Sequence, residues 1–146
     1  MQAEGLALLD AELITLLEFS PLAHIEKLIE LLEENHGVTY KHTILAQPNG
    51  NIHIGFLHKE GIDVENVQLL EGSEGEYSRG RRAISVDVSV GKFKDILIGV
   101  HLKSGRNRPE QLLRDSQCKF IGDYITQLRN TQGLKIEPFC LWEILI

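Results

Sequence analysis

The chain has 146 residues, which is enough for one domain with a sizeable core but not for two. Its hydrophobic content of 42% is typical of a globular protein and excludes a disordered chain. The net charge of −6 argues against a protein that coats nucleic acid, because such a protein needs a basic surface.

The first third of the sequence predicts a helix, a buried strand and a second helix. Residues 3–9 carry leucines at helical spacing, and the apolar run at residues 13–17 predicts a short buried strand that ends at Glu18. Ser20-Pro21 is a typical helix start, with an N-cap hydroxyl followed by proline. Apolar residues then recur every three or four positions until Gly37, which predicts the end of that helix.

From residue 40 to residue 101 the pattern predicts strands, at residues 40–46, 52–58, 64–70 and 82–90, and a last one that follows Gly91 and ends at His101. Pro48-Asn49-Gly50 predicts a hairpin turn. Residues 71–80, rich in Gly, Ser and Glu, predict a mobile loop. The apolar residues 96–100 are typical of a fully buried strand.

Residues 109–130 predict a long amphipathic helix, and residues 138–146 predict a final strand. The core-facing stripe of the helix comprises Leu113, Phe120, Ile121, Tyr124, Ile125 and Leu128. Gln117 falls on the same stripe. Its amide either has a hydrogen-bond partner in the core or lies at the boundary of the stripe.

Two predicted strand ends carry residues suited to a phosphate site. Glu18 ends one strand, and His101, Lys103 and Ser104 follow another; α/β proteins usually place ligands at such ends. A carboxylate there can hold a divalent cation, and a histidine can hydrogen-bond a phosphate oxygen. Both residues also have structural interpretations, since Glu18 could interact with a helix dipole and His101 could be an inert strand-end histidine.

Charge is unevenly distributed along the chain. Acidic residues concentrate at 26–34 and 60–76, whereas residues 101–114 carry Lys103, Arg106, Arg108 and Arg114 against Glu110 alone. A basic loop on an acidic body suits a phosphate-sized target, although a solvated loop would give the same pattern.

The cysteines and the apolar runs bear on the compartment. Cys118 and Cys140 have neither metal-ligand spacing nor the pattern of a disulfide framework, so a reducing, cytoplasmic setting is expected. No signal peptide is visible, and the longest apolar runs are far too short to span a membrane.

Three stretches resemble the endonuclease/exonuclease/phosphatase superfamily of metal-dependent phosphohydrolases, which includes deoxyribonuclease-like nucleases and abasic-site endonucleases. AELITLLEFSP, from residue 11, is similar to the family's buried strand that ends in a metal-binding Gln-Glu pair. PNGNIHIGFLHKEGIDV, from residue 48, resembles the hairpin after the first helix. RRAISVDVSV and DILIGVHLKSGRNRPEQLLRDSQCKFIGDYI resemble the central strand, the His-Leu turn and the helix with Arg-x-x-Gln. The resemblance covers roughly residues 11–139.

The resemblance implies a role for each candidate residue. It makes Glu18 a metal ligand and His101 a catalytic residue that contacts the phosphate. It assigns phosphate or substrate binding to Arg81, Arg82, Lys103 and Ser104, and structural support to Arg114 and Gln117. The implied cofactor is Mg²⁺ or Mn²⁺, and the implied substrate is a nucleic acid or a small phosphoester.

The implied fold is α/β: one mixed, mainly antiparallel sheet with two main helices on one face, half of the family's four-layer sandwich. The family's first strand, with its asparagine, would precede residue 1, and Leu17 stands where the family has glutamine. Where Gly-Asp-Phe-Asn is expected, near residue 142, the sequence reads WEILI, which is what codons for Met-Gly-Asp-Phe-Asn encode after loss of one base. Residues 1–146 are therefore expected to form a single partial domain.

Such a fragment is expected to have little or no activity alone. The alternatives are a non-catalytic remnant that keeps a phosphate-binding edge, and an interaction module that binds a partner through a bare sheet face. That bare face predicts self-association or pairing with the missing half.

Overall fold

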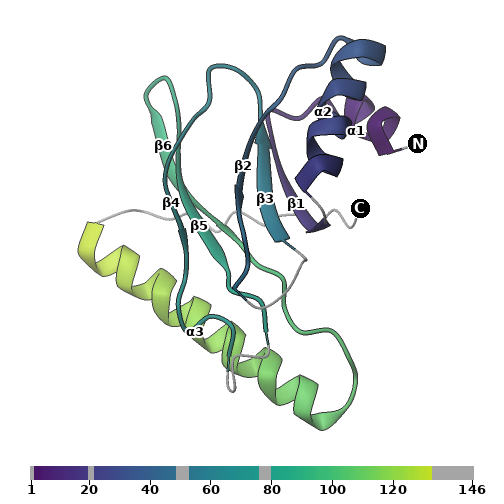
Figure 1. Ribbon diagram of the computed structural model, residues 1–146. Helices are drawn as coiled ribbons and strands as arrows, with labels where there is room; N and C mark the ends of the chain where they lie inside the picture. Colours follow the sequence, from purple (N-terminus) through teal and green to yellow (C-terminus); the bar gives the residue numbers. More distant parts are fainter. Residues whose placement is uncertain (1, 20–21, 49–52, 76–79, 133–146) are drawn as a thin grey trace.

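A computed structural model describes residues 2–19, 22–48, 53–75 and 80–132 (Figure 1). Its elements are, in chain order, α1 (Gln2–Leu9), β1 (Leu13–Phe19), α2 (Leu22–His36), β2 (Lys41–Leu45), β3 (His53–His58), β4 (Asp63–Leu69), β5 (Ile84–Val90), β6 (Phe93–Gly99) and α3 (Arg108–Gln132). Each lies where the sequence pattern predicts it. The strand predicted at residues 138–146 lies outside the described residues. No helix in the described part is long and apolar enough to cross a membrane.

Local sequence accounts for the buried face and the C-terminal end of α2, while its predicted start at Ser20-Pro21 lies outside the described residues. Apolar residues at helical spacing, among them Ile25 and Leu32, face the core and are almost fully buried. Gly37 ends the helix with φ at +65°, a left-handed conformation that costs glycine little. Its backbone N–H donates to the Glu33 carbonyl at 3.0 Å, so the predicted C-terminal stop is confirmed.

The described strands form two antiparallel sheets of three strands each. Sheet A has the order β1-β3-β2, and sheet B has the order β4-β5-β6. Leu16 lies opposite Gly55 in sheet A, and Val86 lies opposite Leu97 in sheet B. Because side chains alternate along a strand, each sheet has two distinct faces.

The inner faces of the two sheets pack against one another. Leu17, Ile54 and Phe56 of sheet A form one cluster with residues of sheet B, among them Ile84 and Val86, and each of these five is at most 3% exposed. Gly99, at the end of β6, permits close packing at this point. A Cβ there would lie 2.8 Å from Ile84 Cγ2 and 3.2 Å from Ile54 Cγ2.

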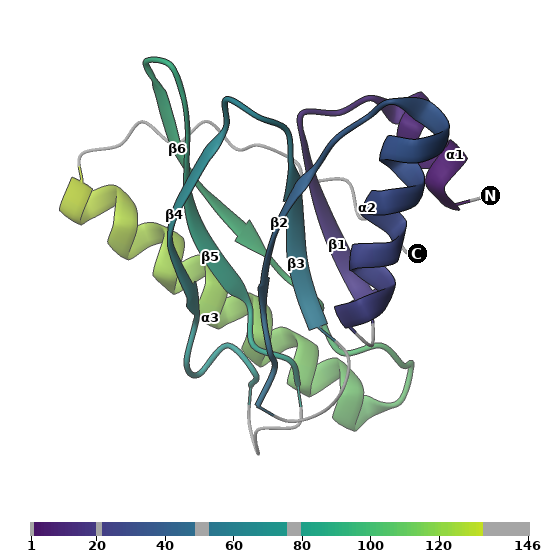
Figure 2. The same cartoon turned by 45° about the horizontal axis from the view of Figure 1, so that its top comes forward.

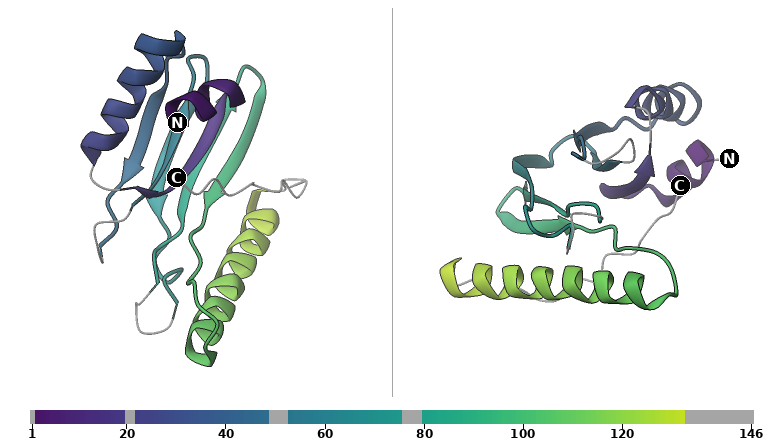
Figure 3. Two further views of the ribbon diagram at one scale, coloured as in Figure 1. Left: turned by 90° about the vertical axis from the view of Figure 1, so that its right-hand side faces the viewer. Right: turned by 60° about the horizontal axis from the view of Figure 1, so that its bottom comes forward.

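Helices cover the outer face of each sheet. Leu6 of α1 and Leu28 of α2 pack with Leu16 of β1 in a second cluster outside sheet A. On the far side of sheet B, the Tyr124 hydroxyl of α3 lies 3.4 Å from the Ser85 hydroxyl of β5. Figures 2 and 3 show α1 and α2 on one side of the strands and α3 along the other. The described residues therefore form four layers, two of helices and two of sheet.

The α/β class and the likeness to part of a four-layer sandwich are confirmed, but the arrangement of the layers differs from the expectation. A single mixed sheet with two helices on one face was predicted. The structure instead has two antiparallel sheets, with α2 and α3 on opposite sides. The predicted bare sheet face is wrong for the described residues, because the two apolar inner faces bury one another.

The loop predicted at residues 71–80 is confirmed over residues 71–75, which form turns in which Ser73 and Glu74 are buried. One smaller prediction is wrong. The strand at residues 96–100 was expected to be fully buried, yet Ile96, Leu97 and Ile98 are only half-buried. The reason is that β6 is an edge strand of sheet B, so one of its sides has no neighbouring strand in that sheet.

Candidate functional site

The ends of β1 and β6 bring Glu18 and His101 together. Glu18 Oε1 lies 3.1 Å from His101 Nε2. The imidazole is buried, whereas the Glu18 side chain is 42% exposed. The two candidate residues that the sequence placed at separate strand ends therefore share one site, which solvent reaches from the carboxylate side.

The backbone at Glu18 is unusual. Its φ is +58°, and it lies at a shift in the β1–β3 register between Leu17 and Phe19. A left-handed glutamate costs on the order of 1 kcal/mol, and a strand irregularity of this kind redirects a side chain. Here the irregularity accompanies a carboxylate that points at His101.

Arg81 also contacts His101. Its Nη1 lies 2.8 Å from His101 Nδ1 and 3.4 Å from Nε2. Because Nη1 is within 3.4 Å of both ring nitrogens, the guanidinium lies over the ring and not in line with one nitrogen lone pair. The imidazole therefore lies between a carboxylate and a guanidinium.

The turn after His101 is fixed by two residues of α3. Gln117 Oε1 accepts from the Lys103 backbone N–H at 2.9 Å, and Arg114 Nη1 donates to the carbonyls of Lys103 and Gly105 at 2.7 Å and 3.0 Å. Gln117 is 1% exposed and also donates through Nε2 to the Ser73 carbonyl at 3.3 Å. It is therefore a hydrogen-bonded core amide and does not lie at the boundary of the stripe.

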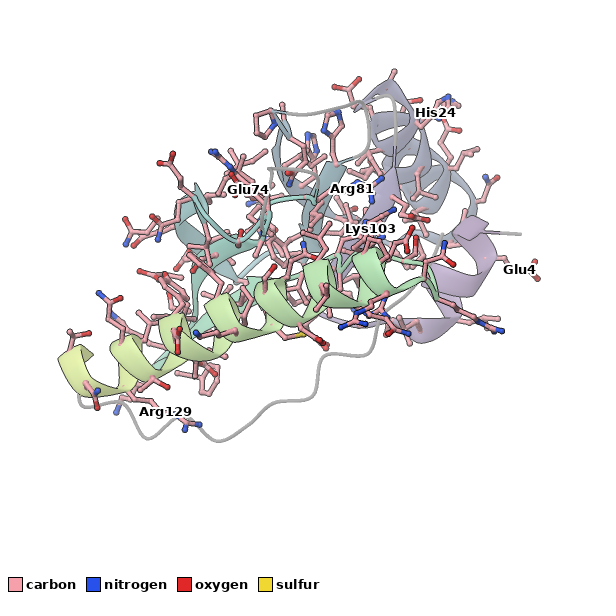
Figure 4. All side chains as sticks on the ribbon, turned by 90° about the horizontal axis from the view of Figure 1, so that it is seen from below. Glu4, His24, Glu74, Arg81, Lys103 and Arg129 are labelled. Carbon is pink, nitrogen blue, oxygen red and sulfur yellow. The ribbon has the colours of Figure 1, made fainter. Side chains whose placement is uncertain are left out.

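Of the remaining predicted site residues, Lys103 and Ser104 lie on this turn and Arg82 does not reach it. Lys103 is half-buried and Ser104 is exposed. Figure 4 shows Arg81 and Lys103 close together over the N-terminal half of α3. Arg82 points elsewhere: its Nη2 lies 3.1 Å from Glu74 Oε1, in an ion pair with a buried carboxylate.

Sequence reasoning missed two residues near the site, Gln47 and Glu74. Gln47 is 6% exposed and makes two hydrogen bonds to the backbone of Arg82. Burial raises the pKa of the Glu74 carboxyl, but hydrogen bonds from its own backbone, from Arg82 and from the Gly72 N–H outweigh burial and lower the pKa overall. Both residues belong to segments that read as turns or loops, and nothing in the local pattern distinguishes them.

The described residues do not by themselves make a metal site. Mg²⁺ prefers six oxygen ligands, usually one or two carboxylates together with waters and phosphate oxygens. Glu18 is the carboxylate that these residues bring to His101, and it is already paired with the imidazole. Within the described ranges, no group of three or more His, Cys, Asp or Glu side chains could hold a metal ion. Of the ligands that the implied Mg²⁺ or Mn²⁺ would need, Glu18 is the one that the described residues would supply beside His101.

No protein-family model matches this sequence, and no curated protein matches it either. Solved structures do match. The chain is similar to TDP2 from Caenorhabditis elegans, with 21% identity and a TM-score of 0.68 over 88% of this chain and 36% of that one. It is similar to a truncated form of the same protein, of which it covers 47%. It is also similar to a humanized D. rerio TDP2 carrying 14 mutations, with 17% identity and a TM-score of 0.60.

The chain covers between 36% and 48% of the length of these TDP2 chains. TDP2 is a 5′-tyrosyl-DNA phosphodiesterase of the endonuclease/exonuclease/phosphatase superfamily. At these identities the likeness shows the fold. The fold of this chain therefore matches part of the fold of these TDP2 structures, in line with the resemblance in the sequence.

Proposed function

We propose that this chain carries the phosphate-binding part of a metal-dependent phosphoester hydrolase of the nuclease and phosphatase type. One observation carries the proposal. Glu18, His101 and Arg81 come from three separate parts of the chain and meet within hydrogen-bonding distance at the ends of β1 and β6. The fold that the chain shares with TDP2 supports a phosphodiester, such as a nucleic-acid end, as the substrate class.

Arg81 and His101 would hold the phosphate. A guanidinium has five donors, and its fork matches two oxygens of a phosphate. The bond to His101 occupies one nitrogen of that fork and fixes its direction. Lys103 and Ser104, on the adjacent turn, would add a cation and a hydroxyl.

The charge around the turn favours the same ligand. Arg106, Arg108 and Arg114 follow Lys103 within eleven positions, on a chain whose net charge is −6. A local positive field on an acidic body attracts small anions and disfavours long polyanions. A phosphodiester near the end of a strand of nucleic acid fits this description better than the middle of a duplex.

Hydrolysis requires more than the described residues offer. In metal-dependent phosphohydrolysis the ion polarises the phosphate and helps to supply the attacking hydroxide. The described part of the chain brings one carboxylate to His101. Loss of members from such a catalytic unit costs orders of magnitude in rate. We therefore expect the chain to bind a phosphodiester without hydrolysing it appreciably.

Calorimetric titration with a thymidine dinucleotide tests the binding. Arg81→Gln should weaken binding about tenfold, because it removes a charge-assisted contact. Arg81→Lys should rescue binding only in part, since it keeps the charge and loses the fork. The control is Lys119→Gln on the exposed side of α3, which removes the same charge and should leave affinity unchanged.

Two results would overturn the proposal. One is the absence of any titratable binding to the wild-type chain at millimolar dinucleotide. The other is an affinity that falls equally in Arg81→Gln and in Lys119→Gln, because the contribution would then come from net charge alone. Turnover of bis(p-nitrophenyl) phosphate with Mg²⁺ or Mn²⁺ is measured in parallel, and we expect it to stay at background.

A further inference from the structure

Gln47 lies just beyond the end of β2 and binds the backbone of a residue 35 positions away. Its Oε1 accepts from the Arg82 N–H at 2.9 Å, and its Nε2 donates to the Arg82 carbonyl at 2.9 Å. The side-chain amide thus satisfies both backbone groups of one residue, as a neighbouring strand would. Gln47 is 6% exposed, so these bonds face little competition from water.

A second glutamine holds the preceding residue from the opposite layer. Gln117 Nε2 lies 3.5 Å from the Arg81 carbonyl, while Gln117 Oε1 holds the Lys103 N–H. The side chain of Arg82 is in turn tied to Glu74. The backbone of Arg81 is therefore held on each flank, by a residue next to sheet A and by one on α3.

The backbone around Arg81 is fixed in this way, and the side chain of Arg81 contacts His101. An arginine side chain has several rotatable bonds, and ordering it against an imidazole is entropically costly. Fixing the backbone from which it starts lowers the number of competing arrangements. The guanidinium is thereby kept at 2.8 Å from His101 Nδ1, beside the imidazole that contacts Glu18.

We infer that Gln47 is a positioning residue for the phosphate site. It touches neither His101 nor the proposed phosphate, and it acts by holding the Arg82 backbone so that Arg81 stays against His101. The inference rests on the proposed function, because it makes Gln47 necessary for phosphate affinity through Arg81. A glutamine that served stability alone would not transmit its effect through that arginine.

A double-mutant cycle separates the two roles. Gln47→Leu keeps the approximate size of the side chain and removes both hydrogen bonds. It should weaken binding of the thymidine dinucleotide about fivefold, as loss of one well-placed contact does. In an Arg81→Gln background the same change should have an effect of less than about twofold, because the two residues act in series.

Ser73→Ala is the matched stability control. The Ser73 hydroxyl accepts from the Ala83 N–H at 2.8 Å, so its loss loosens the same segment without releasing the Arg82 backbone. It should lower the urea midpoint, as Gln47→Leu does, and leave dinucleotide affinity unchanged. If Gln47→Leu proves unfolded, Gln47→Glu replaces it, because it keeps the acceptor for the Arg82 N–H and sets an oxygen against the Arg82 carbonyl.

The ring nitrogens of His101 give a readout that does not depend on phosphate. Their ¹⁵N chemical shifts at fixed pH should differ between the wild type and Gln47→Leu, because the guanidinium of Arg81 lies within 3.4 Å of both nitrogens in the wild type. Wild-type shifts in a folded Gln47→Leu would overturn the inference, as would an affinity loss that persists undiminished in the Arg81→Gln background. Failure of the proposed function looks different: Arg81→Gln alone would leave affinity unchanged while the shifts still respond to Gln47→Leu.

Discussion

Replacement of Gln117 by leucine tests whether one buried amide holds the site turn and the 71–82 segment together. The amide makes three hydrogen bonds to backbone groups: to the Lys103 N–H at 2.9 Å, to the Ser73 carbonyl at 3.3 Å and to the Arg81 carbonyl at 3.5 Å. Leucine is close to glutamine in volume, so little of the effect would come from a cavity. The main cost is the Lys103 N–H left without its acceptor, which is about 1–3 kcal/mol for a buried donor. The two longer bonds add little, and the gain from burying leucine offsets part of the loss, so the net destabilisation should be about 2 kcal/mol.

Urea unfolding followed by fluorescence or circular dichroism measures this change. With a denaturant slope of about 2 kcal/mol/M, the midpoint should fall by about 1 M. Gln127→Leu, on the exposed side of the same helix, is the control and should change stability by less than about 0.5 kcal/mol. If the Gln117→Leu midpoint falls no further than that of the control, Gln117 does not hold these segments and the hydrogen-bond argument is refuted.

The remaining predictions concern packing and pH. A Cβ at Gly80 would lie 2.3 Å from the Glu74 carbonyl oxygen, so Gly80→Ala should cost about 1–3 kcal/mol in thermal unfolding. At Gly122 nothing lies within 4 Å of the position that a Cβ would take, and Gly122→Ala should stabilise α3 by about 0.5–1 kcal/mol. A Gly80→Ala variant that is more stable than Gly122→Ala would contradict the packing at these two positions. The pKa of Glu74 is lowered in the folded chain, so its ionised carboxyl contributes fully to the free energy of unfolding above the unfolded pKa of 4.5. This contribution should be lost as the pH falls below that value, and the free energy of unfolding of Glu74→Gln should depend less on pH. Burial lowers the pKa of His58, so the urea midpoint should also fall as the pH drops below 6.5, and an equally steep fall in His58→Phe would show that another group is responsible.

The elements of the fold could be predicted because their signals are local. Gly37 ends α2 and has the positive φ that its position requires. The alternation of Ile84, Val86 and Val88 with polar residues identified the buried face of β5, and all three side chains are buried. Signals of this kind depend only on neighbours a few positions away.

The arrangement of the sheets could not be predicted in the same way. The alternating pattern predicts that β3 and β5 each bury one face, but it does not predict which element covers that face. In the structure Phe56 of β3 packs with Ile84 of β5, so the two apolar faces cover one another. A resemblance to one half of a larger sandwich suggested that these faces would stay bare, because it assigned their partners to the absent half.

The sequence identified the titratable residues of the candidate site, but it did not identify the residues that hold them in place. Glu18 and His101 stood out because a charged or titratable residue ended an apolar run. Gln47 did not stand out, because its role depends on two hydrogen bonds to the backbone of Arg82, which is 35 positions later in the sequence. Arg81 and Arg82 are adjacent and chemically identical, and only the tertiary structure turns the first to His101 and the second to Glu74.

Backbone strain bears on whether Glu18 belongs to a phosphate site or only interacts with a helix dipole. Among the described residues, three that are not glycine have positive φ: Asp10, Asn66 and Glu18. Aspartate and asparagine adopt that conformation readily because their short side chains bond locally, whereas glutamate gains no such compensation. A carboxylate that merely complemented a helix dipole would not need a left-handed backbone. The strained geometry accompanies the contact with His101, and retained strain of this kind supports the proposal that Glu18 belongs to a phosphate site.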